Sequence, residues 1–236
     1  MIAVEQHLAG RKLVVVALPG TSEYVGGVEA MLKVAGATIT AKVTVQDKFF
    51  DPTMATELLY LASQSSQPSI QMEGLPLNSD GVETASAQLA LTLLQRTTGT
   101  QPTPDDVAAV LTAYTKGGYL AVDDNAVGGA EGAVIVSGEP ATDKDAGRKS
   151  QSAVTLATQF SEDKPLVVAG AGVGDGNLVS AVRGDPKLVK DISTVDNAST
   201  VPGQVATALA TAERIVQAKV GQYGLGGSSL VPKAAA

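Results

Sequence analysis

Glycines in the segment 166–176 are spaced as they often are in phosphate-binding loops. The segment reads LVVAGAGVGDG, an apolar run that ends in glycine at every second position. The dinucleotide fingerprint Gly-x-Gly-x-x-Gly does not fit, because its third glycine would fall on Asp175 or on Asn177, depending on the starting glycine. No lysine follows Gly176, as a Walker phosphate loop requires. The segment therefore predicts a structural turn with no bound nucleotide or other cofactor.

Acidic residues lie at the ends of several predicted strands. Asp123 and Asp124 follow one strand, and Asp175 and Asp196 lie near the ends of two others. Open α/β sheets bind ligands at strand ends, and hard cations such as Mg²⁺ prefer carboxylate oxygens. Aspartate is equally common in turns and at helix starts. We favour the turn interpretation and keep cation binding as the alternative.

Nucleophilic catalysis has few residues available to it. The chain contains no cysteine and one histidine, His7, which precedes the first predicted strand. It also lacks a Gly-x-Ser-x-Gly elbow. A Ser-His-Asp relay would need a histidine from a terminal segment that nothing in the sequence anchors. We expect His7 to be a surface residue and the protein not to be an enzyme, with no catalytic residue assigned.

The composition limits the classes of partner. The chain has 236 residues, 44% of them hydrophobic, which is enough for one large core. A net charge of −7 argues against a nucleic-acid partner. The longest aliphatic run, Leu13 to Leu18, is far shorter than the roughly 20 residues that a membrane-spanning helix needs. We therefore expect the chain as given to be soluble. The opening MIAVEQHLAG also lacks the features of a signal peptide.

Apolar runs and helical spacing predict strands and helices in alternation. Strands are predicted at residues 12–18, 39–46, 119–122, 133–136, 166–169 and 191–195, the last being the final strand. Helices are predicted at 22–34 with Ser22 as cap, from Asp51-Pro52, from Asp80, and at 103–114, 144–160 and 201–220. Long helices between strands require parallel pairing. We therefore predict a three-layer α/β fold, Rossmann-like or flavodoxin-like, with a mainly parallel sheet and helices on both faces.

The same pattern predicts the domain organisation. Residues 1–11 are interpreted as an N-terminal connector and residues 12–223 as a single α/β domain. Residues 224–236 are rich in Gly, Ser and Ala, which predicts a flexible C-terminal tail.

Both ends of the chain resemble a known family. The segments that carry the resemblance are DISTVDN at 191–197, Pro202-Gly203, Ala208-Leu209 and VGQYG at 220–224, together with LAGRK at 8–12 before VVVALPG, and GATITA at 36–41 before VTV. In this order they resemble the actinobacterial family typified by mycobacterial copper transport protein B. The similarity extends from Val4 to Leu225 and rests on the ordered set of segments rather than on one chemical motif.

The resemblance implies a role in copper efflux or copper homeostasis on the extracytoplasmic side of the cell envelope. It also implies that the precursor carries an N-terminal membrane segment and a coiled coil, and that the partners are other envelope or membrane proteins. Whether the protein forms a homo-oligomer is left open. An outer-membrane channel is proposed for the family, but a barrel needs strands of about 10 residues without intervening helices. We therefore expect that this domain is not itself the pore.

Copper(I) prefers thiolate, thioether and imidazole ligands. The chain offers only His7 and four methionines, Met1, Met31, Met54 and Met72, which are far apart in sequence. Met31 and Met54 fall inside predicted helices, where core packing is an equally good explanation for them. We predict that the isolated domain does not bind copper tightly, and the residues of any metal site stay unknown.

Three functional hypotheses remain at this point. The first is a membrane-tethered extracytoplasmic domain that acts through protein contacts in a copper-related envelope assembly. The second is a domain that binds a small ligand or a cation through the acidic residues at the strand ends. The third is a degenerate enzyme fold that serves as a scaffold. Fold analogy alone does not separate them.

Overall fold

The fold contains one mixed but mainly parallel sheet. A computed structural model describes residues 6–72, 75–76, 78–139, 142–162 and 164–232 of the chain. Its strands are β1 (Lys12–Ala17), β2 (Thr38–Val45), β3 (Leu120–Val122), β4 (Gly132–Ser137), β5 (Leu166–Gly170), β6 (Ile192–Val195) and β7 (Gln222–Tyr223). They form a seven-stranded sheet in the order β3-β2-β1-β4-β5-β6-β7, in which only β2 and β3 pair antiparallel. The predicted fold class is confirmed.

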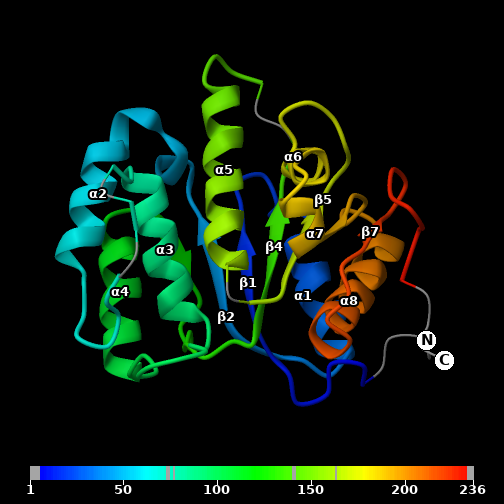
Figure 1. The fold of residues 1–236 in the computed structure, drawn as a ribbon, viewed down its shortest axis with the longest axis horizontal. Coiled ribbons are helices and arrows are strands. Elements are labelled where there is room, and N and C mark those ends of the chain that lie inside the picture. Colours follow the sequence, from blue (N-terminus) through cyan, green and yellow to red (C-terminus); the bar gives the residue numbers. More distant parts are fainter. Residues whose placement is uncertain (1–5, 73–74, 77, 140–141, 163, 233–236) are drawn as a thin grey trace.

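Helices cover both faces of this sheet. They are α1 (Val25–Val34), α2 (Ala55–Gln64), α3 (Gly81–Leu93), α4 (Pro104–Lys116), α5 (Ala146–Ser161), α6 (Leu178–Gly184), α7 (Leu188–Asp191) and α8 (Val201–Val216), with 3₁₀ helices η1 (Asp47–Phe50) and η2 (Pro52–Met54). Figure 1 shows α2, α3 and α4 on one side of the molecule and α1 and α8 on the other. The buried apolar residues accordingly form two cores separated by the sheet.

The strand sequences explain this layering. In β1, Val14 and Val16 face the core under α2 to α6, while Leu13 and Val15 face the core under α1 and α8. A strand that is buried on both faces must be apolar throughout, as the sequence of β1 predicts. In β2, Ala41, Val43 and Val45 face the core under α2 to α6, whereas Ile39 packs against the core under α1 and α8. Lys42 is only partly buried. The predicted alternation of β2 between a buried and a wetted face is confirmed from Ala41 to Val45. It is wrong at Ile39 and Thr40, where the pairing register with β1 shifts.

Most of the predicted helix starts are correct. The side chain of Asp80 accepts a hydrogen bond from the Glu83 amide at the start of α3, and Thr103 caps α4 in the same way. The predicted cap at Ser22 is wrong, because α1 begins at Val25 without a side-chain cap. The backbone carbonyl of Thr21 accepts the first amide hydrogen bonds of α1 instead. Asp51 caps the 3₁₀ helix η2, and α2 follows it.

The C-terminal part differs from the prediction in three respects. The strand at 191–195 is not the last one, because β7 adds a further parallel strand beside β6. Helix α8 ends at Val216 rather than at Val220, and Ala218 just beyond it has a φ of +54°, which a helix cannot accommodate. Residues 224–229, predicted to belong to a flexible tail, fold back on β7 through a bridge between Tyr223 and Ser229.

The connector before β1 is also attached to the domain where the structure describes it. Leu8 is fully buried in the core under α1 and α8, and its amide donates a hydrogen bond to the Ala35 carbonyl at 2.7 Å. The expectation of an unanchored segment around His7 is therefore wrong for residues 6–11, although His7 itself is exposed. The placement of the domain boundaries stays a prediction.

Candidate functional site

The strand order reverses between β1 and β4, which is where doubly wound folds hold their ligands. Here the loops after these two strands touch each other. A Cβ atom on Gly138 would lie 2.4 Å from the Pro19 carbonyl oxygen, so the two backbones are in direct contact. The Tyr24 hydroxyl also donates a hydrogen bond to the Ser137 carbonyl at 2.6 Å. Burial and the nearby charge of Glu139 raise the pKa of Tyr24 to about 12, so this donor keeps its proton. At the reversal point the described parts of the loops after β1 and β4 therefore contact each other directly.

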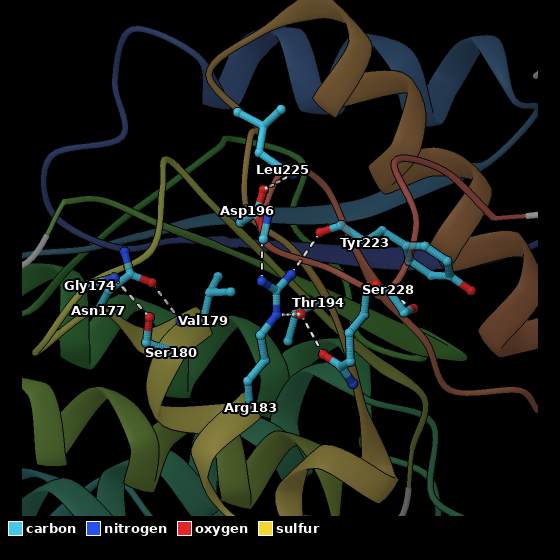
Figure 2. Close-up of polar contacts among 12 residues, drawn as sticks. Gly174, Asn177, Val179, Ser180, Arg183, Thr194, Asp196, Tyr223, Leu225 and Ser228 are labelled. Carbon is cyan, nitrogen blue, oxygen red and sulfur yellow. Dashed lines mark hydrogen bonds and ion pairs between the residues drawn. The ribbon is translucent and has the colours of Figure 1, made fainter.

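The glycine-rich segment follows β5 and therefore lies away from this reversal point. Gly170 is needed for packing, because a Cβ there would lie 2.7 Å from Val179 of α6 and 2.9 Å from the Ser137 hydroxyl. The amide of Gly174 donates to the Ser180 hydroxyl, and the side chain of Asn177 caps α6 by accepting from the Val179 amide (Figure 2). These contacts make the segment a tight strand-to-helix turn. That it binds no nucleotide stays a prediction.

Asp196, which follows β6, is the centre of a buried polar cluster beside this turn. Its carboxylate accepts hydrogen bonds from the backbone amides of Leu225 at 2.7 Å and Gly226 at 2.8 Å. Arg183 rises from α6 and donates to the same carboxylate at 2.8 Å (Figure 2). The side chains of Asp196 and Arg183 are only 1% and 15% exposed. Three donors therefore satisfy Asp196 within the protein.

Arg183 ties further parts of the chain to this cluster. Its Nε donates to the Thr194 hydroxyl of β6 at 2.8 Å, and its Nη2 donates to the Tyr223 carbonyl of β7 at 2.7 Å. One guanidinium group thus joins α6, β6, β7 and Asp196, which suits its planar set of donors. We name Arg183, Thr194, Asp196 and the 225–226 backbone the Asp196 cluster.

The remaining acidic residues lie elsewhere, so the structure does not bring the strand-end carboxylates together into one group. Strand β3 runs antiparallel to β2, so Asp123 and Asp124 leave it toward the amino ends of the parallel strands, away from Asp175 and Asp196. Asp123 lies beside Lys42, with 3.2 Å between its carboxylate and the ammonium group. Asp175 is exposed in the glycine-rich turn. The sequence could not show the direction of so short a strand.

Lys42 connects Asp123 to Glu29 on α1, which lies 3.3 Å from the same ammonium group. Burial alone would raise the pKa of Glu29, but the hydrogen bonds from Lys33 and Lys42 outweigh it and hold that pKa below its ordinary value. Desolvation would lower the pKa of Lys42, yet the two carboxylates leave it raised. We name Glu29, Lys42 and Asp123 the Lys42 cluster.

The candidate copper ligands do not form a common site in the structure. Met31 of α1 packs against the core under α1 and α8, whereas Met54 of η2 packs against the core on the opposite face of the sheet. Met72 is partly buried in the segment between α2 and α3, and Met1 lies outside the described residues. Within the ranges given above, no group of three or more His, Asp or Glu side chains is placed to hold a metal ion.

A hollow of about 500 Å³ runs along α3, between the segment before that helix and the end of α5. Its wall is apolar at Ala87, Ala90 and Leu94, and it carries charge at Glu83 and Arg96. Most of its lining lies between residues 71 and 98, and the end of α5 adds a wall that is distant along the chain and that the sequence does not reveal. No helix in the described part of the chain is long and apolar enough to cross a membrane.

Comparisons with known proteins give a family. The family described as "Copper transport outer membrane protein, MctB" matches residues 2–232. The chain belongs to this family. The chain is 26% identical over 230 residues to the copper transporter MctB of Mycobacterium tuberculosis and to that of Mycobacterium bovis, and the match covers 94% of this chain and 73% of each relative. It is 25% identical over 233 residues to the Mycobacterium leprae protein of the same name, with the same coverage.

Family membership confirms the resemblance that the terminal segments carried. The structure shows in addition that two of those segments meet at the Asp196 cluster. DISTVDN contains both Thr194 and Asp196, and VGQYG ends at the glycine next to the Asp196 carboxylate. Arg183, their partner in space, was not singled out, because a lone arginine near the end of a predicted helix carries no signal of its own. The closely spaced glycines Gly224 and Gly226 are the signal in the sequence that could have indicated a close backbone contact there.

Proposed function

We propose that this chain is the extracytoplasmic domain of a membrane-tethered envelope protein with a role in copper transport. It acts without catalysis, through contacts with other envelope or membrane proteins. Membership of the copper transport outer membrane protein family supports the copper role and the location in the envelope. The membrane tether and the identity of the partners rest on the resemblance described above.

One observation carries the non-enzymatic part of this proposal. At the carboxyl ends of its parallel strands, the described loops contact one another and satisfy their own polar groups. At the reversal point the Pro19 and Gly138 backbones touch, and further along the edge Asp196 is satisfied by Arg183 and two backbone amides. Ligands of doubly wound folds bind at this edge. A domain that closes it is better suited to present a surface than to hold a substrate.

The positions of the methionines support a role without a resident copper ion. Met31 and Met54 pack into cores on opposite faces of the sheet, so they cannot both bind one ion. Soft copper(I) sites need two to four converging sulfur or imidazole ligands. We infer that copper is handled by other parts of the assembly.

The carboxyl edge also offers an apolar surface for protein contacts. Val173 and Leu225 are 56% and 82% exposed and lie on neighbouring loops. A Cβ on Gly226, next to Leu225, would lie 3.4 Å from the Val173 side chain. Exposed apolar surface marks protein contact sites where it is contiguous, and these two loops touch. We place the partner contact at these two residues.

The test replaces both residues in the full-length protein with Val173→Asp and Leu225→Asp. Cells that depend on the protein for copper tolerance should accumulate copper as if the protein were missing. The control, Val127→Asp, changes a 50% exposed valine on the loop after β3, and it should behave like the wild type. Thermal unfolding of the purified variants should be unchanged. Normal copper content in cells with the double variant would contradict the assigned contact surface.

The alternative function is the binding of a small ligand or a cation, and the hollow along α3 is now the feature that could support it. Asp123 and Asp124 lie toward the amino ends of the parallel strands, whereas Asp175 and Asp196 lie at the carboxyl ends. A shared Mg²⁺ site among these acidic residues is therefore not supported. The hollow along α3 is the observation that favours a small ligand, because its volume of about 500 Å³ is in the range of known ligand sites. Added Mg²⁺ should leave the unfolding temperature unchanged, and a clear rise would revive the cation hypothesis.

A further inference from the structure

Residues 224–231 cross the outer edge of the last strand, and we call them the strap. The Gly224 amide donates to the Ser229 carbonyl at 3.0 Å, and the Ser228 amide donates to the Gln222 carbonyl at 2.8 Å. The Ser228 hydroxyl donates to the same carbonyl at 3.0 Å. The strap therefore occupies hydrogen-bonding groups of β7 that the edge strand of a sheet otherwise leaves open.

The strap is fastened to the body of the domain at Asp196. Two successive amides, those of Leu225 and Gly226, point at one carboxylate and form a small anion-binding nest. The nest requires glycine beside it, because a Cβ on Gly224 would lie 2.0 Å from a carboxylate oxygen of Asp196. Gly224 also has a φ of +106°, a conformation that other residues rarely adopt.

Apolar packing contributes little to holding the strap. Leu225 is 82% exposed and Leu230 is 61% exposed, and Val231 is exposed as well. The residues that flank the strap, Tyr223 and Pro232, are buried. Segments with few buried apolar contacts open at a lower free-energy cost than the core of the same protein. The strap thus lies between two fixed points and depends on polar bonds that converge on one side chain.

We propose that the strap opens and closes as a unit between Tyr223 and Pro232, with Asp196 as its latch. In the closed state it covers the edge of β7 and holds Leu225 beside the glycine-rich turn. In the open state the carbonyl of Gln222 loses its strap partners, and Leu225 leaves its position. This inference does not depend on the proposed role in copper transport.

The test is hydrogen exchange of individual backbone amides in the intact chain. In the wild type the amides of Leu225, Gly226 and Ser228 should exchange together and much faster than those of β4 and β5. Asp196→Asn should speed the exchange of these strap amides by roughly 10- to 100-fold beyond any change in β4 and β5, because charged hydrogen bonds to two amides are lost. Asp175→Asn, a change of an exposed aspartate on the neighbouring turn, is the matched control and should have no effect.

Two results would overturn the proposal. The first is that the strap amides of the wild type exchange no faster than the β4 and β5 amides. The strap would then open only when the whole domain unfolds. The other is strap exchange that Asp196→Asn leaves unchanged. If Asp196→Asn does not fold, Gly224→Ala displaces the strap without altering the carboxylate, with Gly147→Ala, which meets no atom within 4 Å, as its control. Strap exchange unchanged by Gly224→Ala would equally overturn the proposal.

Discussion

The Asp196 cluster and the Lys42 cluster both contain aspartates that follow a strand, but water reaches them to very different degrees. Asp196 is 1% exposed and accepts hydrogen bonds from an arginine and from two backbone amides. Asp123 is 56% exposed and has an ammonium group 3.2 Å away. A buried carboxylate must have all its hydrogen bonds made within the protein, whereas an exposed one is solvated. Aspartates that look alike in the sequence therefore have different roles, and neither cluster has the features of a metal site.

The largest expected effect that separates the two clusters comes from Asp196→Ala. It leaves Arg183 without its ionic partner and two strap amides without an acceptor. Breaking a buried ion pair by removing one partner typically costs about 3–5 kcal/mol, and we expect a loss of that size in the free energy of unfolding. Urea denaturation measures it. A loss below about 1 kcal/mol, the value typical of exposed pairs, would remove the distinction between the clusters.

The second effect concerns the turn next to the Asp196 cluster. Gly170→Ala would place a methyl group 2.7 Å from Val179 and 2.9 Å from the Ser137 hydroxyl. Forcing extra volume into a packed site costs about 1–3 kcal/mol, so the variant should unfold at a lower temperature. Gly147→Ala on α5 meets no neighbouring atom within 4 Å and should not be destabilising. Equal stability of the two variants would show that Gly170 is not there for packing and would reopen the question of a ligand-binding role.

A smaller effect is expected from Asp123→Asn in the Lys42 cluster. This change removes the charge of an exposed partner of Lys42 and leaves Glu29 in place. Exposed ion pairs contribute about 0–1 kcal/mol, so the midpoint of urea denaturation should scarcely move. A loss of more than about 2 kcal/mol would mean that the Lys42 cluster is as structural as the Asp196 cluster.

The smallest effect is the pH dependence that Glu29 contributes. Its pKa in the folded protein is held below the ordinary value of 4.5, so its ion pairs stabilise the fold fully above that value. The contribution is lost as the pH falls through the lowered pKa. At neutral pH the free energy of unfolding of the wild type, measured by urea denaturation, should exceed that of Glu29→Gln by a few tenths of a kcal/mol. This difference should shrink in acid. A difference that grows in acid would show that the sign is wrong.

The sequence predicts the central strands well because their burial leaves a clear pattern. Strand β1 lies between two cores and is apolar from Leu13 to Ala17. Strand β2 alternates from Ala41 onward because only one of its faces is fully covered there. Helix starts at Asp80 and Thr103 follow from local capping chemistry, in which the side chain and the amide it accepts from are three residues apart. Patterns of this kind depend on neighbours in the chain.

Other features depend on neighbours in space, and the sequence did not predict them. Strand β3 has three residues, and its direction is set by the partner it meets rather than by its own side chains. Strand β7 has two residues, too few for a pattern. The Arg183–Asp196 pair joins residues that precede and follow β6, and a single sequence does not reveal the contact. The sequence therefore predicted that Asp196 is a candidate site residue. It did not predict that Asp196 forms a buried ion pair with Arg183.

We propose that this domain holds no copper ion of its own. A competition titration of the purified domain against a copper(I) chelator of known affinity tests it most directly. We predict that the chelator removes all the copper at sub-nanomolar free copper(I). Retention of one equivalent of copper under these conditions, abolished by His7→Ala or by any one of the Met→Leu changes at Met31, Met54 and Met72, would contradict the claim and make the domain itself a copper carrier.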